Sequence, residues 1–423
     1  MFVTKGFTMT ELEFAKKIRD AGGTAYLVGG AVRDKFRNVE AHDRDYCITG
    51  IDEKIFTGLF PDAEKFGKSF PVYSIEIDGK HCEVAFARTE KKFGTGYRGF
   101  EILFAPTVTI EQDLFRRDTT INAMAIEILS GELVDPFGGR EDVLNKKIRA
   151  VSKHFTDDPV RALRAARQAA QFNFEISAET IDAMKLCGEE LADEPTERIF
   201  DELATALKTD VPSIFFRSLE RADLLAIIFP EIANLRGKIQ PTEFHPEGDA
   251  YEHTLNLLDA VAKVNPKPIV RFAALMHDIG KGTTPPEMLP HHYLHERRGL
   301  DVLKKMSQRM TLPGDWKKSA TFVIREHMRA PRLKHAGKIV DLLLSINTLK
   351  ISVRDFCDII NADNHGLPPY LEHAQEIISE LMKIGGRHAP SELSGVEVGK
   401  WIHDERIRRF VALNKNFREE DKN

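Results

Sequence analysis

Cysteine is scarce in this chain of 423 residues, which has only Cys47, Cys82, Cys187 and Cys357 and no C-x-x-C pair. This spacing argues against a disulfide framework and a cysteine zinc site, and it suits a reducing compartment. An apolar run of transmembrane length, an internal repeat and a low-complexity tract are also absent. Because the first residues are expected to form an amphipathic helix rather than a signal peptide, we predict a cytoplasmic protein with no membrane partner.

The composition is that of an ordinary globular protein, with 42% hydrophobic and 30% charged residues. At about 100 to 200 residues per domain, the length predicts about two to four domains. Short β-type and helical runs mix over residues 24–150, which predicts an α+β domain on a small mixed sheet. After about residue 156 the apolar residues recur at helical spacing, so we expect an all-α remainder with no strand and a Pro/Gly-rich linker at 229–250.

The segment "AYLVGGAVRDKF" (25–36) predicts a strand, a glycine turn and a helix start, which would direct backbone N–H groups toward an anion. The G-x-G-x-x-G spacing is absent, which argues against a Rossmann fold. Such a turn is more often structural than functional, so it indicates a phosphate site only together with other motifs.

Asp43 and Asp45 in "HDRDYCITG" would face the same side of a strand, because side chains alternate along it. Two adjacent carboxylates repel each other unless solvent or a divalent cation offsets their charge, and such oxygen ligands suit Mg²⁺ that carries phosphates. A solvated edge pair is the alternative interpretation. Glu83 in "HCEVAFAR" is the candidate third carboxylate, from a neighbouring strand.

Two further segments accompany these carboxylates. Residues 87–100 are predicted to form a Gly-rich, basic and aromatic loop, and residues 113–125 place Arg116, Arg117 and Asp118 before a buried run.

The stretch "DDPVRALRAAR" (157–167) predicts a helix that Asp157 or Asp158 caps, with Pro159 in its first turn. One side of this helix would carry Asp158, Arg161, Arg164 and Arg167, spaced at i+3. A capped, salt-bridged surface helix is the alternative to a ligand-binding one.

The motifs G-G-A-V-R-D, D-x-D, R-R-D-T-T-I-N-A-M-A and D-D-P-V-R-A-L-R, in this order, resemble those of the bacterial (class II) tRNA nucleotidyltransferases, the CCA-adding enzymes of the polymerase-beta-like superfamily. The resemblance covers residues 24–170 by motif and the rest of the chain more loosely. It implies addition of C, C and A to the 3′ end of tRNA from CTP and ATP without a nucleic-acid template.

The resemblance also implies residue roles. Asp43, Asp45 and, as a third acid, Glu83 would be catalytic, and the two aspartates would hold Mg²⁺ for in-line transfer to the 3′-hydroxyl. The implied nucleotide-binding residues are Gly30, Arg33, Arg117, Asp158, Arg161, Arg164 and Arg167.

Asp158 and Arg161 match the family's protein template. A carboxylate accepts from an exocyclic amine while a guanidinium donates to a ring nitrogen, and cytosine and adenine both present that pair. Uracil and guanine present a carbonyl instead, a mismatch of roughly several kcal/mol. The family usually has Glu-Asp where this chain has Asp157 and Asp158, so the shorter first acid departs from the pattern.

Histidines supply a second group of candidate ligands. The run "ALMHDIGKG" places an adjacent His-Asp pair after an apolar helix, and imidazole and carboxylate ligands without cysteine suit a hydrolytic metal site. The pattern resembles HD-domain metal phosphohydrolases, which implies the ligands His253, His277, Asp278 and Asp363 for a divalent transition metal such as Ni²⁺, Mn²⁺ or Co²⁺.

The HD resemblance implies further that His295 and His327 contact phosphate or a second metal. Its implied activities are 2′,3′-cyclic phosphodiesterase, 2′-nucleotidase and phosphatase. His291, His292 and His365 are predicted to be bystanders.

Together the resemblances imply a polymerase-beta-like head (1–150), an all-α neck with the nucleobase template (151–235), an HD domain (240–370) and a helical tail (371–423), as a monomer or homodimer. One region is basic: between Arg297 and Lys338 twelve Lys/Arg oppose three acids, although the whole chain carries a net charge of −5. The segment is either a solvated helical surface or a polyanion-binding face, and we expect it to contact the tRNA backbone.

Three alternatives stay open. A bacterial poly(A) polymerase shares the head motifs, and an HD phosphohydrolase with a regulatory nucleotide-binding head would use only the second site. A relative that adds only CC or only A is the third. A non-catalytic RNA-binding module would leave both carboxylate sets unexplained.

Overall fold

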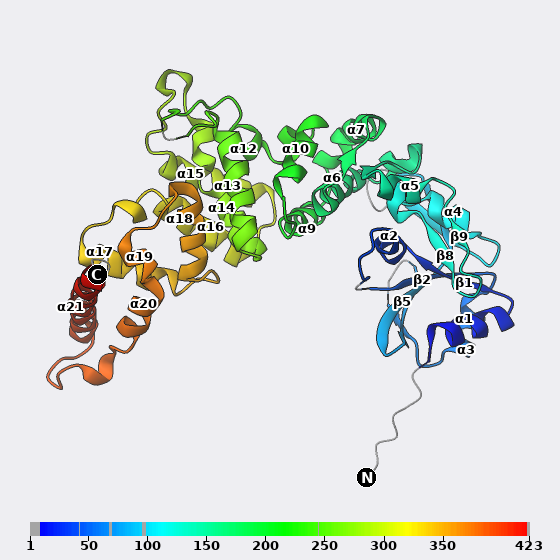
Figure 1. Cartoon of the computed structure of the whole chain (residues 1–423), viewed down its shortest axis with the longest axis horizontal. Coiled ribbons are helices and arrows are strands. Elements are labelled where there is room, and N and C mark those ends of the chain that lie inside the picture. The colour runs from blue at the N-terminus through cyan, green and yellow to red at the C-terminus, as the bar shows by residue number, and fades with distance from the viewer. Residues whose placement is uncertain (1–8, 42, 67–69, 95–98, 244, 421–423) are drawn as a thin grey trace, which may run out of the picture. The chain divides into compact units, whose positions relative to one another are not determined.

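The computed structural model describes residues 9–41, 43–66, 70–94, 99–243 and 245–420 (Figure 1). The chain divides into two compact units, one of residues 1–199 and 214–228 and the other of residues 200–213 and 229–423. No helix in the described ranges is both long and apolar enough to cross a membrane.

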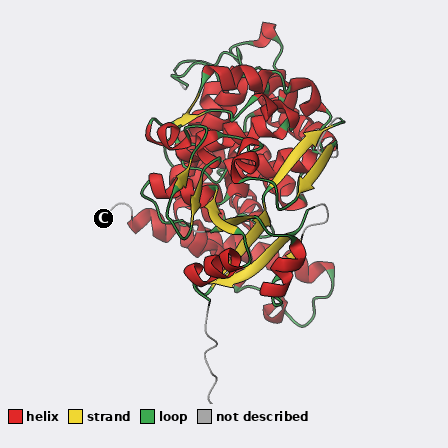
Figure 2. Ribbon diagram, turned by 90° about the vertical axis from the view of Figure 1, so that its right-hand side faces the viewer, coloured by secondary structure: helices red, strands yellow, loops and turns green. Residues whose placement is uncertain are grey.

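The first unit is built on a mixed sheet with the strand order β3-β4-β5-β2-β1-β8-β9, and strands are yellow in Figure 2. The strands are β1 (Thr24–Val28), β2 (Asp45–Thr49), β3 (Glu64–Phe66), β4 (Val72–Ile77), β5 (Lys80–Phe86), β8 (Ala125–Glu127) and β9 (Leu133–Val134). β2 pairs with β5 in parallel and with β1 antiparallel. The expected α+β head with a small mixed sheet is therefore confirmed.

An aromatic core supports one face of this sheet. Phe14 from α1 (Glu11–Asp20) contacts Tyr46 of β2, and Phe56 from α3 (Glu53–Leu59) contacts Tyr73 of β4. All four rings are at most 2% exposed, and such buried aromatic pairs give the sheet a rigid base. The predicted N-terminal amphipathic helix corresponds to α1, and residues 1–8 lie outside the described ranges.

Two expectations about strands were wrong. The expected loop 87–100 is largely a hairpin of β6 (Arg88–Lys92) and β7 (Phe100–Phe104), because the apolar run at 100–104 pairs with the residues after Ala87; residues 95–98 lie outside the described ranges. The helical part also contains the strand β11 (Glu175–Ile176), which pairs in parallel with β10 (Lys147–Ile148). A ladder of two residues leaves no periodic signal in a sequence.

The first unit contains further helices, of which α2 contacts β1 and α4 contacts β2. They are α2 (Gly30–Phe36), α4 (Ile110–Phe115), η1 (Thr120–Asn122), α5 (Gly139–Leu144), η2 (Lys153–Asp157), α6 (Val160–Phe172), α7 (Ala178–Lys185), α8 (Gly188–Ala192), α10 (Ser213–Arg221) and α11 (Leu225–Ile228). α9 (Thr196–Ala206) spans the boundary between the units.

In the described part of the second unit, helices joined by loops are the regular elements, and one isolated β-bridge joins Ile239 and Asp249. Its elements are α12 (Pro230–Ala233), α13 (Ala250–Val264), α14 (Pro268–Met276), η3 (Ile279–Thr283), η4 (Pro286–Met288), α15 (His295–Arg309), α16 (Gly314–Glu326), η5 (Ala330–Arg332), α17 (Ala336–Ile346), α18 (Val353–Asn364), α19 (Pro369–Glu372), α20 (Ala374–Met382), η6 (Gly386–His388) and α21 (Val396–Glu420). The apolar α14 is buried within this unit. The expected linker 229–250 packs against the unit, since Gln240 is 1% exposed and Asp249 caps α13.

Candidate active sites

The glycine turn and the predicted carboxylates meet at one end of the head strands. β1 ends at Val28, and Gly29 follows with φ 65°, a conformation that favours glycine. In the strand ladder Val28 lies opposite Asp45, and Asp45 lies beside Glu83 of β5. The register therefore brings Asp45, Glu83 and the turn together.

Like charges gather at this edge. Asp43 lies two residues before the start of β2, so only Asp45 of the expected pair is on the strand. Asp43, Asp45 and Glu83 are all solvent-exposed residues. Partial burial, and then the carboxylates of Glu83 and Asp43, raise the pKa of Asp45, whereas Arg117 lowers it. Three oxygen donors that repel one another at an accessible edge fit a divalent cation such as Mg²⁺.

Arg117 lies over the glycine turn, so that a Cβ added at Gly29 would be 3.1 Å from its Nη1. Asp113 positions it: Asp113 Oδ2 is 3.0 Å from Arg117 Nη2, and Oδ1 is 2.7 Å from Arg116 Nη2. Asp113 is 1% exposed; burial acts to raise its pKa, but the two guanidinium groups outweigh burial and lower it. The sequence interpretation missed Asp113, although its i+3 and i+4 spacing to the arginines was visible.

Arg33, from the first turns of α2, is already engaged. Its Nε and Nη2 donate to Asp34, and its Nη1 donates to Asn122 at 2.7 Å. The guanidinium also lies over the Phe172 ring, 4.2 Å from its centroid. Gly30 begins α2, and a Cβ added there would be 3.4 Å from Arg33 Nη2. These contacts join the glycine motif to η1 and to the end of α6.

Asp158 stands at the start of α6, where its Oδ1 accepts the N–H of Val160 at 3.2 Å. Asp157 instead contacts the His154 ring at 2.8 Å, so Asp158 supplies the acceptor for the helix start. Arg198 Nη2 donates to both oxygens of Asp158, at 3.0 and 2.8 Å. Arg198, which the sequence interpretation missed, therefore fixes the carboxylate plane.

Arg161 is held by backbone carbonyls rather than by Asp158. It is 8% exposed and donates to His154 O and Arg116 O, each at 2.8 Å. Arg161 Nη2 lies 3.9 Å from a carboxylate oxygen of Glu90 on the hairpin. Both members of the expected template pair are thus positioned by other groups.

Asp118 connects the R-R-D segment to α6. Its Oδ2 accepts from Arg164 and from Gln168, each at 2.9 Å, and its Oδ1 accepts the N–H of Thr119 at 2.7 Å. Burial opposes ionisation of Asp118, but Arg164 and these donors hold its pKa well below the usual range. Arg167 donates to Gln171 Oε1 at 2.7 Å.

In the second unit, the two oxygens of Asp278 face different histidines. Oδ2 is 3.0 Å from His277 Nε2 and 3.7 Å from His253 Nε2. Oδ1 is 3.1 Å from His295 Nε2 and 3.4 Å from His327 Nε2. Asp278 is 2% exposed, so this centre is buried.

Asp363 completes the first of these two groups. From the end of α18, its Oδ1 lies 3.2 Å from His253 Nε2 and 3.8 Å from His277 Nε2. We call His253, His277, Asp278 Oδ2 and Asp363 the first ligand group. His295, His327 and Asp278 Oδ1 form the second ligand group.

The tautomers of the four histidines are set for ligation. Each Nδ1 contacts an acceptor. His253 Nδ1 is 2.5 Å from Glu247 Oε1, and His277 Nδ1 is 2.8 Å from Ala274 O. His295 Nδ1 is 2.9 Å from His292 O, and His327 Nδ1 is 3.0 Å from Ile324 O. Within the described part of the chain, the buried Nε2 atoms of His253 and His277 have no hydrogen-bond partner. Imidazoles oriented in this way are typical of metal sites, so the donor set fits a divalent transition metal.

Lys281 balances the charge of Asp278. Its Nζ is 2.6 Å from Asp278 Oδ2 and donates to Gln240 Oε1 at 2.5 Å. Burial acts to raise the pKa of Asp278, but His277 and Lys281 hold it well below its usual value. Lys281 follows the H-D pair by three residues in the sequence, and its role was missed.

The histidines expected to be bystanders differ from one another. His292 supplies the carbonyl for His295 and contacts Thr284 through its ring, and His291 stacks on Tyr293. His365 lines a hollow of about 130 Å³ beside Asp363, so it borders the site.

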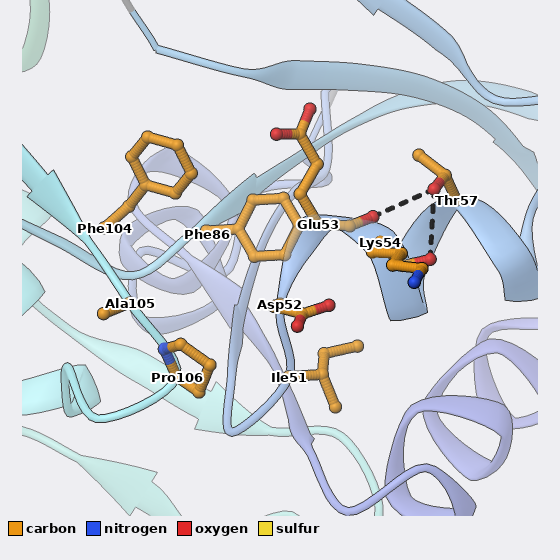
Figure 3. Close-up of a pocket in the computed structure, with 9 residues that line it drawn as sticks. All are labelled: Ile51, Asp52, Glu53, Lys54, Thr57, Phe86, Phe104, Ala105 and Pro106. Carbon is orange, nitrogen blue, oxygen red and sulfur yellow. Dashed lines mark hydrogen bonds between the residues drawn. The ribbon is translucent and has the colours of Figure 1, made fainter.

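A larger hollow in the head lies away from the carboxylates. It has a volume of about 490 Å³ and is lined by the residues labelled in Figure 3, among them Asp52, Phe86 and Phe104. It is at the end of β2 opposite to Asp45, so it takes no part in the site.

Family models match three successive regions of the chain. They are the poly A polymerase head domain over residues 25–149, the probable RNA and SrmB-binding site of polymerase A over residues 173–235, and the HD domain over residues 250–364.

Curated relatives cover most of the chain. A multifunctional CCA protein of Paracidovorax citrulli is 38% identical over 403 residues, which are 89% of this chain and 94% of the relative. One from Nitrosococcus oceani is 46% identical over 331 residues, 77% of this chain and 80% of the relative. Among solved structures, the Bacillus stearothermophilus CCA-adding enzyme in complex with CTP matches with a TM-score of 0.66 at 22% identity, covering 97% of this chain and 96% of that one. The chain therefore belongs to the multifunctional CCA proteins, the CCA-adding nucleotidyltransferases that carry an HD domain.

Proposed function

We propose that the head adds C, C and A in turn to the 3′ end of tRNA, using CTP and ATP without a nucleic-acid template. The observation that carries this proposal is the register that places Asp45 between the end of β1 and Glu83, with Arg117 over Gly29. Solved structural neighbours are described as complexes with CTP, with ATP and with a primer tRNA, which supports these substrates.

Asp43, Asp45 and Glu83 would hold Mg²⁺, which neutralises the triphosphate and lowers the pKa of the attacking 3′-hydroxyl when bound. Arg117, Gly30 and Arg33 lie at the turn and would bind the nucleotide. The N–H groups at the start of α2 and the guanidinium of Arg117 offer donors to phosphate oxygens.

Base selection would use the fixed carboxylate of Asp158 and the fixed guanidinium of Arg161. Arg164, held by Asp118, and Arg167 would contact the nucleotide from the same helix. Because each group is positioned by a separate partner, the pair accepts an amine and donates to a ring nitrogen without a reorganisation cost.

An extension assay tests this proposal with tRNA that lacks CCA and with each nucleotide alone or in pairs. A product that stops after C, C and A from CTP plus ATP supports it. An ATP-only tail of unlimited length would indicate a poly(A) polymerase, and addition of only CC or only A would indicate a split-function relative.

For the HD unit we propose hydrolysis of 2′,3′-cyclic and 2′-phosphoesters at the metal held by the first ligand group, with the second group contacting phosphate or a second ion. The support is the buried Asp278, whose two oxygens face two histidine pairs. The test measures hydrolysis of 2′,3′-cyclic AMP by the wild type and by Asp278→Asn. Activity in the wild type that the variant lacks supports the proposal. A wild-type head that transfers no nucleotide while the HD unit hydrolyses would favour a regulatory nucleotide-binding head instead.

A further inference from the structure

A groove lined by three cationic residues in the second unit belongs to neither ligand group. It lies between α16 and the C-terminal end of α17, with a volume of about 490 Å³. Its wall is mainly apolar and includes Phe322 and Leu349, and the polar residues that line it are Lys317, Lys318, Thr321, Arg325, Ser345 and Thr348. We call it the α16 groove.

The charge of the α16 groove is uncompensated at two positions. Lys317 and Lys318 are exposed, and no carboxylate in the described ranges lies within 4.0 Å of either ammonium group. Arg325 is also exposed and pairs with Glu326 at 2.8 Å, but Glu326 accepts from Arg329 as well. Among the described residues that line the groove none is acidic, so the three cations favour an anion.

The hydroxyl groups of the lining are already used within their own helices. Thr321 donates to Lys317 O, Ser345 to Leu342 O and Thr348 to Ser345 O. Recognition therefore depends on the cations rather than on directed hydrogen bonds. A ligand with repeated negative charge and little need for base contacts suits such a surface.

We propose that the α16 groove binds the sugar-phosphate backbone of tRNA, an inference that rests on the proposed CCA-adding function for its choice of RNA. The charge complementarity of Lys317 and Lys318 carries it. The basic segment 297–338 contains an equivalent pair outside the groove, Lys304 and Lys305 of α15, which are exposed and also lack a carboxylate within 4.0 Å in the described part of the chain.

The experiment compares two charge reversals in the full chain, K317E/K318E and K304E/K305E. Both change the net charge equally at exposed helix positions, so equal thermal unfolding temperatures show that both variants are folded. Fluorescence anisotropy measures the Kd for a tRNA transcript that lacks CCA across a salt series. Steady-state extension of the same transcript gives KM for tRNA and for CTP.

K317E/K318E should raise the Kd for tRNA by about tenfold or more and lower the salt slope by about 2, since each lost phosphate contact lowers it by about 1. K304E/K305E should change the Kd by less than about threefold. KM for tRNA should rise in the first variant and KM for CTP should stay constant.

Equal effects of the two reversals, or an unchanged Kd in K317E/K318E, would overturn the proposal. A higher KM for CTP with an unchanged Kd for tRNA would assign the groove to free nucleotides and would also overturn it. The wild type could also bind tRNA without adding CCA, while K317E/K318E loses tRNA binding. That outcome would support the tRNA-binding role of the α16 groove and refute the proposed CCA-adding function.

Discussion

The head and the HD unit arrange their carboxylates in opposite ways. In the head, Asp43, Asp45 and Glu83 are exposed at one end of the interior strands β2 and β5. In the HD unit, His277 and Asp278 are 1% and 2% exposed, and the imidazoles are oriented by contacts at Nδ1. An exposed set suits an ion that arrives with a triphosphate and leaves with pyrophosphate, whereas a buried, oriented set suits a resident ion.

The largest expected effect separates the two sites. Asp45→Asn should lower the rate of nucleotide addition by about a thousandfold or more, because it removes a ligand that acts only in transfer. Hydrolysis of 2′,3′-cyclic AMP should be unchanged in this variant. Asp278→Asn should show the reverse pattern in the same two assays, and loss of both activities in either variant would contradict independent sites.

The head also contains a buried carboxylate, Asp113, which should contribute to its stability. Asp113→Ala leaves Arg116 and Arg117 without their shared buried carboxylate, so the free energy of unfolding should fall by about 3 to 5 kcal/mol. Denaturant unfolding measures this loss. Asp20→Ala, at the solvent-exposed pair with Arg19, is the control and should change the free energy of unfolding by about 1 kcal/mol or less.

The orientation of the HD imidazoles can be tested through Glu247. Glu247→Gln weakens the acceptor for His253 Nδ1, and metal affinity should fall by about 10- to 100-fold. Titration calorimetry with Mn²⁺ measures the affinity without relying on hydrolysis. Glu296→Gln provides a control, since Glu296 is 4.0 Å from His295 Nδ1 and should leave the affinity unchanged.

The smallest effect concerns base selection. Arg198→Met removes the two hydrogen bonds that orient the carboxylate of Asp158. The ratio of kcat/KM for CTP to kcat/KM for UTP should therefore fall by about tenfold. Binding of tRNA in the absence of ATP should be unchanged. Arg198→Lys should restore part of the preference. A uniform loss of rate with CTP and UTP would indicate a merely structural role for Arg198.

The sequence was sufficient for features that depend on local pattern. The glycine turn follows from short-range rules, and the H-D pair lies in the buried centre. The expected strand alternation of Asp43 and Asp45 does not describe the structure, because β2 begins only at Asp45. Contacts between residues distant in the sequence could not be predicted from local pattern. Arg198 lies 40 residues from its partner Asp158, and Gln168 lies 50 residues from its partner Asp118. The hairpin at Arg88–Phe104 was missed because its glycines masked strand-forming residues on both sides.

The contrast between an ion that arrives with the nucleotide and a resident ion is tested most directly by titrating Mn²⁺ into two variants. Asp278→Asn retains the head site, and Asp45→Asn retains the HD centre. Each titration is done with and without a non-hydrolysable CTP analogue. The account predicts that the head binds Mn²⁺ tightly only when the analogue is present, and that the HD centre binds it equally well in both cases. Tight binding by the head without nucleotide, or nucleotide-dependent binding by the HD centre, would contradict it.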